Sequence, residues 1–136
     1  MGLIWPKTTN LAYKSSFVSP NLSANIFIID LFRLSNHGLM IEVGRHHNTP
    51  RDKRFCPFCP RRIENEIHFL YECPTFEHLR SRFLKPTTDT LPGFAFLHND
   101  MKIHILLSSM VKNTSKYIAK GMELRSFLLS KPKSLN

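Results

Sequence analysis

The chain has three cysteines, and they lie close together with one histidine between the second and the third. Cys56, Cys59, His68 and Cys73 give the spacing C-x2-C-x8-H-x4-C. Three thiolates and one imidazole form a common ligand set of closed tetrahedral zinc sites, with two ligands on a tight turn and two on a later element. The spacing therefore predicts a structural Zn²⁺ site. The alternative is three small buried thiols and an unrelated histidine, and it requires chance to supply both ligand pairs without any stray cysteine.

The residues around the second ligand pair predict how it reaches the metal. Apolar residues recur at helical spacing and predict a short helix over residues 63–70. On an ideal α-helix Cys73 lies about 140° further round than His68. The two side chains therefore converge only if the helix ends near Glu72, and Pro74 is consistent with that ending.

The Cys-Pro-Phe-Cys turn at residues 56–59 also resembles the redox pair of glutaredoxins. In that family the pair follows a strand and opens a long helix, which lowers the pKa of the first thiol. Here Pro60 pushes Cys59 away from helical backbone, and the charged residues 51–54 are a poor buried strand. Both features argue against a redox pair, and a thiol redox protein is kept as the third hypothesis.

Composition indicates an intracellular globular protein. A length of 136 residues predicts one domain with a modest core, and 42% apolar residues exclude a disordered chain. Clustered cysteines suit a metal site in a reducing compartment, the nucleus or the cytoplasm, better than a disulfide framework. No apolar run reaches the roughly 18 residues of a membrane span, and the first residues lack the pattern of a cleaved signal peptide. We therefore expect no membrane partner.

Basic residues outnumber acidic ones by 19 to 10, and many of them flank the cysteines. Such patches attract polyanions by releasing counterions, which favours RNA or DNA bound with low sequence specificity. The predicted contacts are Arg45, Arg51, Lys53, Arg54, Arg61 and Arg62, together with Phe58, which can stack on an unpaired base. The alternatives are a solvated surface for the charges and packing against the zinc site for Phe55 or Phe58.

Two further groups of residues are candidates for nucleic-acid binding and for metal ligation. A second basic group runs from Lys112 to Lys133 and includes Arg125. His46 and His47 are spare candidate ligands, but beside a complete set of four they are expected to be exposed loop residues.

Apolar periodicity predicts a mostly α-helical fold with weak strand signals. Helices are expected at residues 25–36, 39–43, 76–84 and 99–111, and a last one opens at Thr114 or Ser115. The last two could pair as an antiparallel hairpin. The expected organisation is an irregular arm (1–24), a helical zinc-binding domain (25–85), a linker (86–98), a C-terminal helical pair (99–130) and a basic tail (131–136).

Residues 31–37, 41–45, 54–59 and 64–74 resemble the C-terminal zinc-binding region of reverse transcriptases from non-long-terminal-repeat retrotransposons. In that family a Cys-Cys-His-Cys knuckle follows the polymerase and is thought to contact template RNA or target DNA. The resemblance covers roughly residues 25–85 and implies Cys56, Cys59, His68 and Cys73 as ligands. Nothing here resembles the polymerase core, because the chain is short and has no adjacent Asp-Asp pair.

The leading hypothesis is therefore a zinc-folded nucleic-acid-binding module without catalytic activity. The second hypothesis is a zinc-folded protein-interaction module that binds a partner through the apolar faces of its last two helices.

Overall fold

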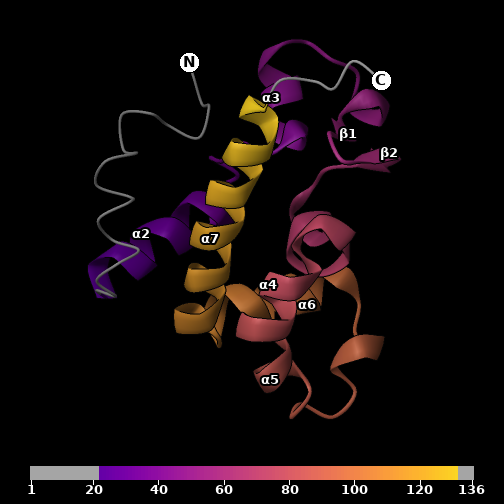
Figure 1. Ribbon diagram of the computed structural model, residues 1–136. Coiled ribbons are helices and arrows are strands. Elements are labelled where there is room, and N and C mark those ends of the chain that lie inside the picture. The colour runs from indigo at the N-terminus through magenta and orange to yellow at the C-terminus, as the bar shows by residue number, and fades with distance from the viewer. Residues whose placement is uncertain (1–21, 132–136) are drawn as a thin grey trace.

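The computed structural model describes residues 22–131 of the chain, with side chains from residue 27 onward (Figure 1). Most of the expected arm (1–24) and of the basic tail (131–136) lies outside the described residues, although residues 22–24 already belong to a helix. The α-helices are α2 (Leu22–Arg33), α3 (Met40–His46), α4 (Glu77–Phe83), α5 (Lys85–Thr88), α6 (Asn99–Ser108) and α7 (Val111–Ser130). The remaining elements are strands β1 (Phe55–Cys56) and β2 (Cys59–Ile63), a π-helix (His68–Glu72), and 3-10 helices at Arg51–Lys53, Pro74–Phe76 and Phe94–Phe96.

The predicted mostly helical fold is confirmed, and its strands form one short antiparallel hairpin, β1–β2. The hairpin gave no clear strand signal because it covers few residues and includes Pro60 and two consecutive arginines. Its function is local, since it places the first two cysteines across from one another.

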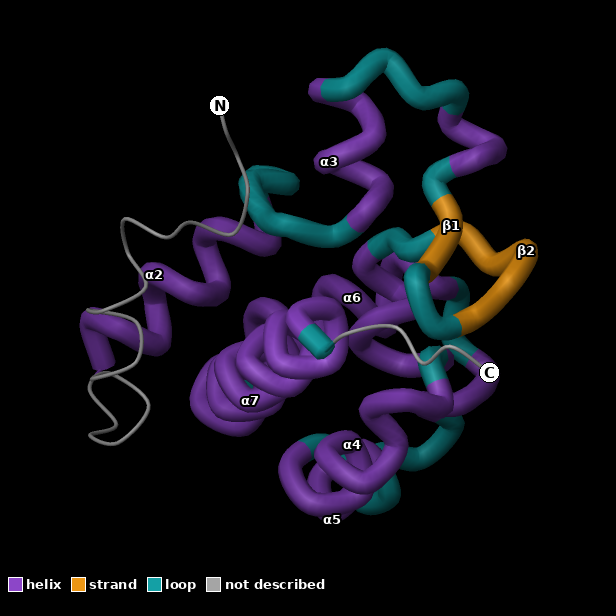
Figure 2. The backbone as a smooth tube through the Cα atoms, turned by 45° about the horizontal axis from the view of Figure 1, so that its top comes forward, coloured by secondary structure: helices purple, strands orange, loops and turns teal. Residues whose placement is uncertain are grey.

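Helix α7 is the central element of the fold. It contacts α2, α4 and α6, and Figures 1 and 2 show it between α2 on one side and the α4–α5 region on the other. Tyr117 and Ile118 are completely buried, and Met122 is nearly so. The apolar face of α7 is therefore covered by the protein's own helices around Tyr117 to Met122, whereas Phe127 and Leu129 near its end are exposed.

Aromatic rings join the cysteine- and histidine-bearing segment, residues 56–73, to α7. Phe69 contacts Phe32, Phe76 and Tyr117, with ring centroids 5.7, 4.9 and 5.4 Å away. Aromatic side chains contribute large buried areas and favour tilted or edge-to-face contacts such as these. One cluster of buried residues extends from Ile28 to Met122, so segments 25–85 and 99–130 share a core.

The expected helices differ from the observed ones mainly at their ends. The helix expected to open at Thr114 or Ser115 begins at Val111, and Leu34, expected in an apolar band, is 76% exposed beyond the end of α2. Residues 86–98, expected as a linker, contain most of α5 and a 3-10 turn whose Phe94 is buried. Tertiary burial of Phe94 thus orders a segment that reads as a linker because it is rich in proline, glycine and threonine.

No helix within residues 22–131 combines the length and the apolar composition that crossing a membrane requires.

Candidate metal centre

The β1–β2 hairpin presents the first two cysteines. Cys56 and Cys59 face each other across the turn, and the backbone N–H of Phe58 donates a hydrogen bond to Cys56 Sγ at 3.4 Å. Hydrogen bonds from backbone amides favour a sulfur that carries negative charge. Phe58 itself is half-buried and packs edge-to-face on Phe76, with ring centroids 6.1 Å apart.

The second ligand pair lies on a helix that begins later than the sequence predicts. Residue Ile63 ends β2, and helical backbone starts only at Glu66, so the expectation of a helix from Ile63 is wrong for its first turn. The hairpin extends this far because the Glu64 N–H still donates to the Arg54 carbonyl at 3.0 Å. Asn65 then caps the helix by accepting from the His68 N–H at 2.9 Å.

A π-helix brings His68 and Cys73 to the same side. The Cys73 N–H donates to the His68 carbonyl at 2.7 Å, which is a hydrogen bond between residues i+5 and i. Residues joined in this way lie closer to one face of the helix than they do on an α-helix, where they point about 140° apart. The helix ends at Glu72 and Cys73 is extended, as the convergence of the ligands requires.

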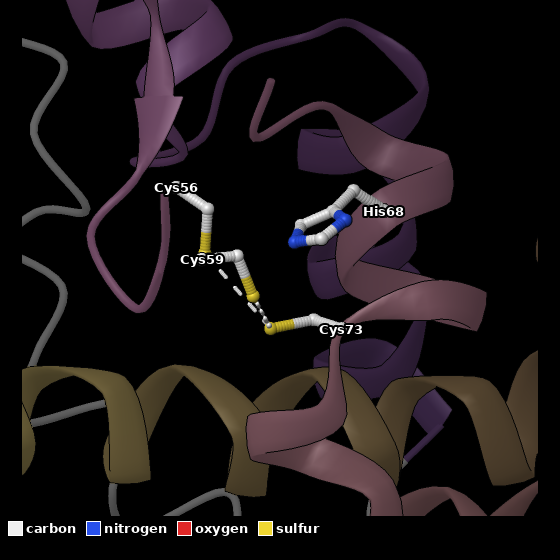
Figure 3. Close-up of side chains that lie close together, drawn as sticks. All are labelled: Cys56, Cys59, His68 and Cys73. Atoms are coloured by element: carbon white, nitrogen blue, oxygen red, sulfur yellow. Dashed lines mark hydrogen bonds between the residues drawn. The ribbon is translucent and has the colours of Figure 1, made fainter. Parts of the chain in front are cut away.

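The four predicted ligands come together. One ligand atom from each of Cys56, Cys59, His68 and Cys73 lies within 4.8 Å of the others, and Figure 3 shows a ring nitrogen of His68 pointing toward the sulfurs. Cys73 Sγ lies 3.9 Å from Cys56 Sγ and 3.6 Å from Cys59 Sγ. A zinc ion with bonds of about 2.3 Å to sulfur gives a tetrahedral S···S edge of about 3.8 Å. These separations match that edge and are far longer than a disulfide bond of about 2.05 Å.

The His68 ring supports a metal at this point. Its side chain is 3% exposed, and within residues 22–131 neither ring nitrogen has a hydrogen-bond partner. A buried polar atom without a partner costs about 1–3 kcal/mol, so such atoms are rare. Glu72 Oε1 lies 3.7 Å from Nδ1, near enough to become the carboxylate that orients a metal-bound imidazole, which leaves Nε2 for the metal.

The pKa values of the three thiols are shifted in different directions. The Cys56 hydrogen bond lowers the pKa of Cys73 far below that of an ordinary thiol, although burial opposes the shift. The same hydrogen bond, together with burial, raises the pKa of Cys56. Burial and the hydrogen bond with Cys73 also raise the pKa of Cys59. Three thiolates at this distance repel one another, so full deprotonation of the cluster requires a cation.

A buried ion pair that the sequence did not indicate fixes the hairpin to α7. Arg125 Nε and Nη2 donate to Glu64 Oε2 and Oε1 at 2.8 and 2.6 Å, and the Met40 N–H donates to Oε1 at 2.7 Å. Arg125 was assigned from sequence to an exposed basic group, but its side chain is 9% exposed. It supports the fold, because its partner Glu64 is fully buried and lies between the two pairs of predicted metal ligands in the sequence.

The predicted nucleic-acid contacts fall into two sets. Arg51, Lys53 and Arg61 are exposed, and the 3-10 helix that carries the first two contacts β2, which carries the third. The backbone of Arg61 is in the left-handed region, with φ of 67°, which is costly for a bulky residue.

The other arginines have partners within the protein. Arg45 Nη2 lies 2.7 Å from Glu42 Oε1, and Arg62 Nη2 lies 3.3 Å from Glu72 Oε1, although both arginines are exposed. Arg54 donates to the carbonyls of Thr49 and Ile41 at 2.9 and 3.0 Å and packs against Gly44.

The two aromatic candidates differ in exposure. Phe58, the predicted stacking residue, is turned toward the core, while Phe55 on β1 is 40% exposed. His46 and His47 are exposed, although His46 belongs to α3 and not to a loop.

Comparison with protein-family models, with curated proteins and with solved structures finds no match to this chain.

Proposed function

We propose that this protein is a non-catalytic, zinc-folded module that binds RNA or single-stranded DNA. The observation that carries the proposal is the convergence of three sulfurs and one buried imidazole at tetrahedral spacing. Four protein ligands close the coordination sphere and leave no position for a substrate or an activated water. The metal's role is then to fold the segment. Bound there, zinc would link the hairpin to the π-helix, with about 10–16 kcal/mol of apparent binding free energy available to folding.

The binding surface that we propose is the basic hairpin surface, formed by Arg51, Lys53, Arg61 and Phe55. Its three cationic side chains are exposed, on two elements that contact each other. Phe55 adds an exposed ring on which an unpaired base can stack, for about 1–3 kcal/mol per base. Arg54 is left out of this surface because its guanidinium holds two backbone carbonyls. Arg45, Arg62 and Phe58 are left out because each contacts another side chain.

Three considerations bear on the choice between this proposal and its alternatives. The resemblance of residues 25–85 to the zinc-binding tail of retrotransposon reverse transcriptases implies the same ligands and the same kind of partner. The protein-interaction alternative has a smaller surface than expected, because much of the apolar face of α7 is buried in the core, and its exposed apolar side chains are Phe127 and Leu129 near the end of α7 and Met101 on α6. The redox alternative requires Cys56 and Cys59 to act as a pair, but Cys73 Sγ lies 3.6 Å from Cys59 Sγ and shares the site. A reducing nucleus or cytoplasm would keep the three thiols available for metal.

The test compares two triple alanine variants of the zinc-loaded protein that remove equal charge. One replaces Arg51, Lys53 and Arg61, and the control replaces the exposed residues Arg82, Lys85 and Lys112 on other elements. Affinity for a labelled single-stranded RNA and DNA is measured over a range of salt concentrations. Each lost phosphate contact reduces the slope of log K against log salt by about 0.7, so the first variant loses about 2 in slope.

The control should keep the wild-type slope. Zinc-loaded protein that binds neither nucleic acid, or equal losses in both variants, would contradict the proposed surface.

A further inference from the structure

The hydrogen-bond pattern of the π-helix leaves one carbonyl without a backbone partner. In this register the Phe69 carbonyl would accept from residue 74, which is Pro74 and has no N–H. The α-helical partner, the Cys73 N–H, is already donated to His68. Phe69 directly follows one ligand and is fully buried, so this carbonyl must be satisfied from elsewhere in the protein.

Two side chains from other helices supply the missing donors. The Tyr117 hydroxyl on α7 donates to the Phe69 carbonyl, and Arg80 Nη1 on α4 lies 3.3 Å from the same oxygen. Arg80 Nη1 also donates to the Tyr117 oxygen at 2.9 Å, and Nη2 donates to the Cys73 carbonyl. Arg80 is 4% exposed and Tyr117 is fully buried. One guanidinium thus holds the carbonyls of Phe69 and Cys73, at the two ends of the ligand-bearing turn.

We infer that Arg80 and Tyr117 are positioning residues that fix the register of the π-helix and thereby the zinc ligands. This inference rests on the proposed zinc site. If the Phe69 carbonyl had no donor, the Cys73 N–H could donate its hydrogen bond to that carbonyl in place of the His68 carbonyl. That change would give the α-helical pattern. Cys73 would then rotate away from His68, because the i, i+5 pair of an α-helix does not share a face. With Arg80 and Tyr117 as donors, the Phe69 carbonyl is already hydrogen-bonded, so the Cys73 N–H stays bonded to the His68 carbonyl.

The test uses the full-length protein and two conservative variants, Tyr117→Phe and Arg80→Lys. The first removes only the hydroxyl, and the second replaces the fork by one ammonium group that cannot hold both carbonyls. The control is Arg125→Lys, the same change at another buried arginine, which contacts Glu64 and neither of these carbonyls. Zinc affinity is measured by chelator competition, and Co²⁺ replaces zinc as the spectroscopic probe.

We expect Tyr117→Phe to weaken zinc binding about 10-fold and Arg80→Lys up to about 100-fold, the range found for residues that orient metal ligands. In both variants the thiolate-to-cobalt charge-transfer band should weaken, because Cys73 leaves the site. The Arg125→Lys protein, measured under conditions where it is folded, should keep the wild-type band. Wild-type bands in both variants, with affinities no lower than that of the control, would overturn the inference. Failure of the wild-type protein to bind zinc would instead overturn the proposed function.

Discussion

At the scale of single residues, the most informative side chain is His68. Its imidazole is buried, and both of its nitrogens lack hydrogen-bond partners within the described chain. A protein that needed only a buried ring could use phenylalanine at no such cost. A metal ion removes the penalty at one nitrogen, and Glu72 is near enough to satisfy the other.

Substitution of a ligand tests this interpretation. His68→Ala or Cys73→Ser should abolish tight zinc binding and the zinc-dependent rise in thermal stability, because metal binding in small domains is largely folding free energy. Melting curves recorded with and without zinc provide the measurement. His46→Ala removes an exposed histidine and should leave both properties unchanged. Equal melting temperatures for the ligand variants and this control would contradict the assignment.

The shifted thiol pKa values predict how zinc binding depends on pH. Near pH 7 the raised pKa values keep Cys56 and Cys59 protonated, whereas the lowered pKa of Cys73 leaves it ionised. Zinc must displace protons from the first two thiols, so binding releases about two thiol protons and weakens as the pH falls, by about 100-fold per unit. Calorimetric titrations in buffers of different ionisation enthalpy count these protons. If zinc binding released no thiol protons, the prediction would be wrong, because all three thiols would already be ionised before zinc binds.

The buried pair of Glu64 and Arg125 predicts a second residue-scale effect. Arg125→Met leaves the Glu64 carboxylate buried without its cation, which typically costs about 3–5 kcal/mol. Denaturant unfolding of zinc-loaded protein measures the loss. Glu123→Gln, which breaks an exposed pair with Lys120 of 3.9 Å, should change stability by less than about 1 kcal/mol.

At the scale of elements, the sequence was sufficient for the ligands and for most helices but not for the π-helix. The ligands can be recognised from sequence because metal ligation depends on residue type and spacing. The π-helix is not, because it depends on hydrogen bonds from Arg80 and Tyr117, which are 11 and 48 residues from Phe69. Pro74 was the available signal, since it removes the N–H that this register needs.

Close approach of α7 to the π-helix gives an element-scale prediction. A Cβ placed on Gly121 would lie 2.6 Å from Cζ of Phe69, whose ring is confined by neighbouring aromatic residues. Gly121→Ala gains about 1 kcal/mol of helix propensity, but overpacking a core costs about 1–3 kcal/mol. We expect a net loss of stability in denaturant unfolding. Ser126→Ala, at an exposed position of the same helix, should be neutral or stabilising. A more stable Gly121→Ala protein would mean that Phe69 can move aside.

At the scale of the whole molecule, the proposed zinc site and α7 belong to one structure. Phe69 and Tyr117 lie in the same buried cluster, and Glu64 and Arg125 connect the hairpin to the far part of α7. Small domains are marginally stable, so loss of the metal should loosen the packing of α7 as well as the hairpin. This dependence follows from contacts between distant segments. A linker at residues 86–98, as the sequence predicts, would instead separate the zinc-binding domain from the C-terminal helices.

The central claim is that four side chains hold one zinc ion, and metal analysis of the purified protein tests it most directly. Native mass spectrometry, with elemental analysis of the same sample, gives the number and the identity of bound ions. The account predicts one zinc per chain, lost together with the folded structure on chelation and absent from the Cys73→Ser variant. A folded wild-type protein that holds no zinc, and whose stability does not change when zinc is added, would contradict it.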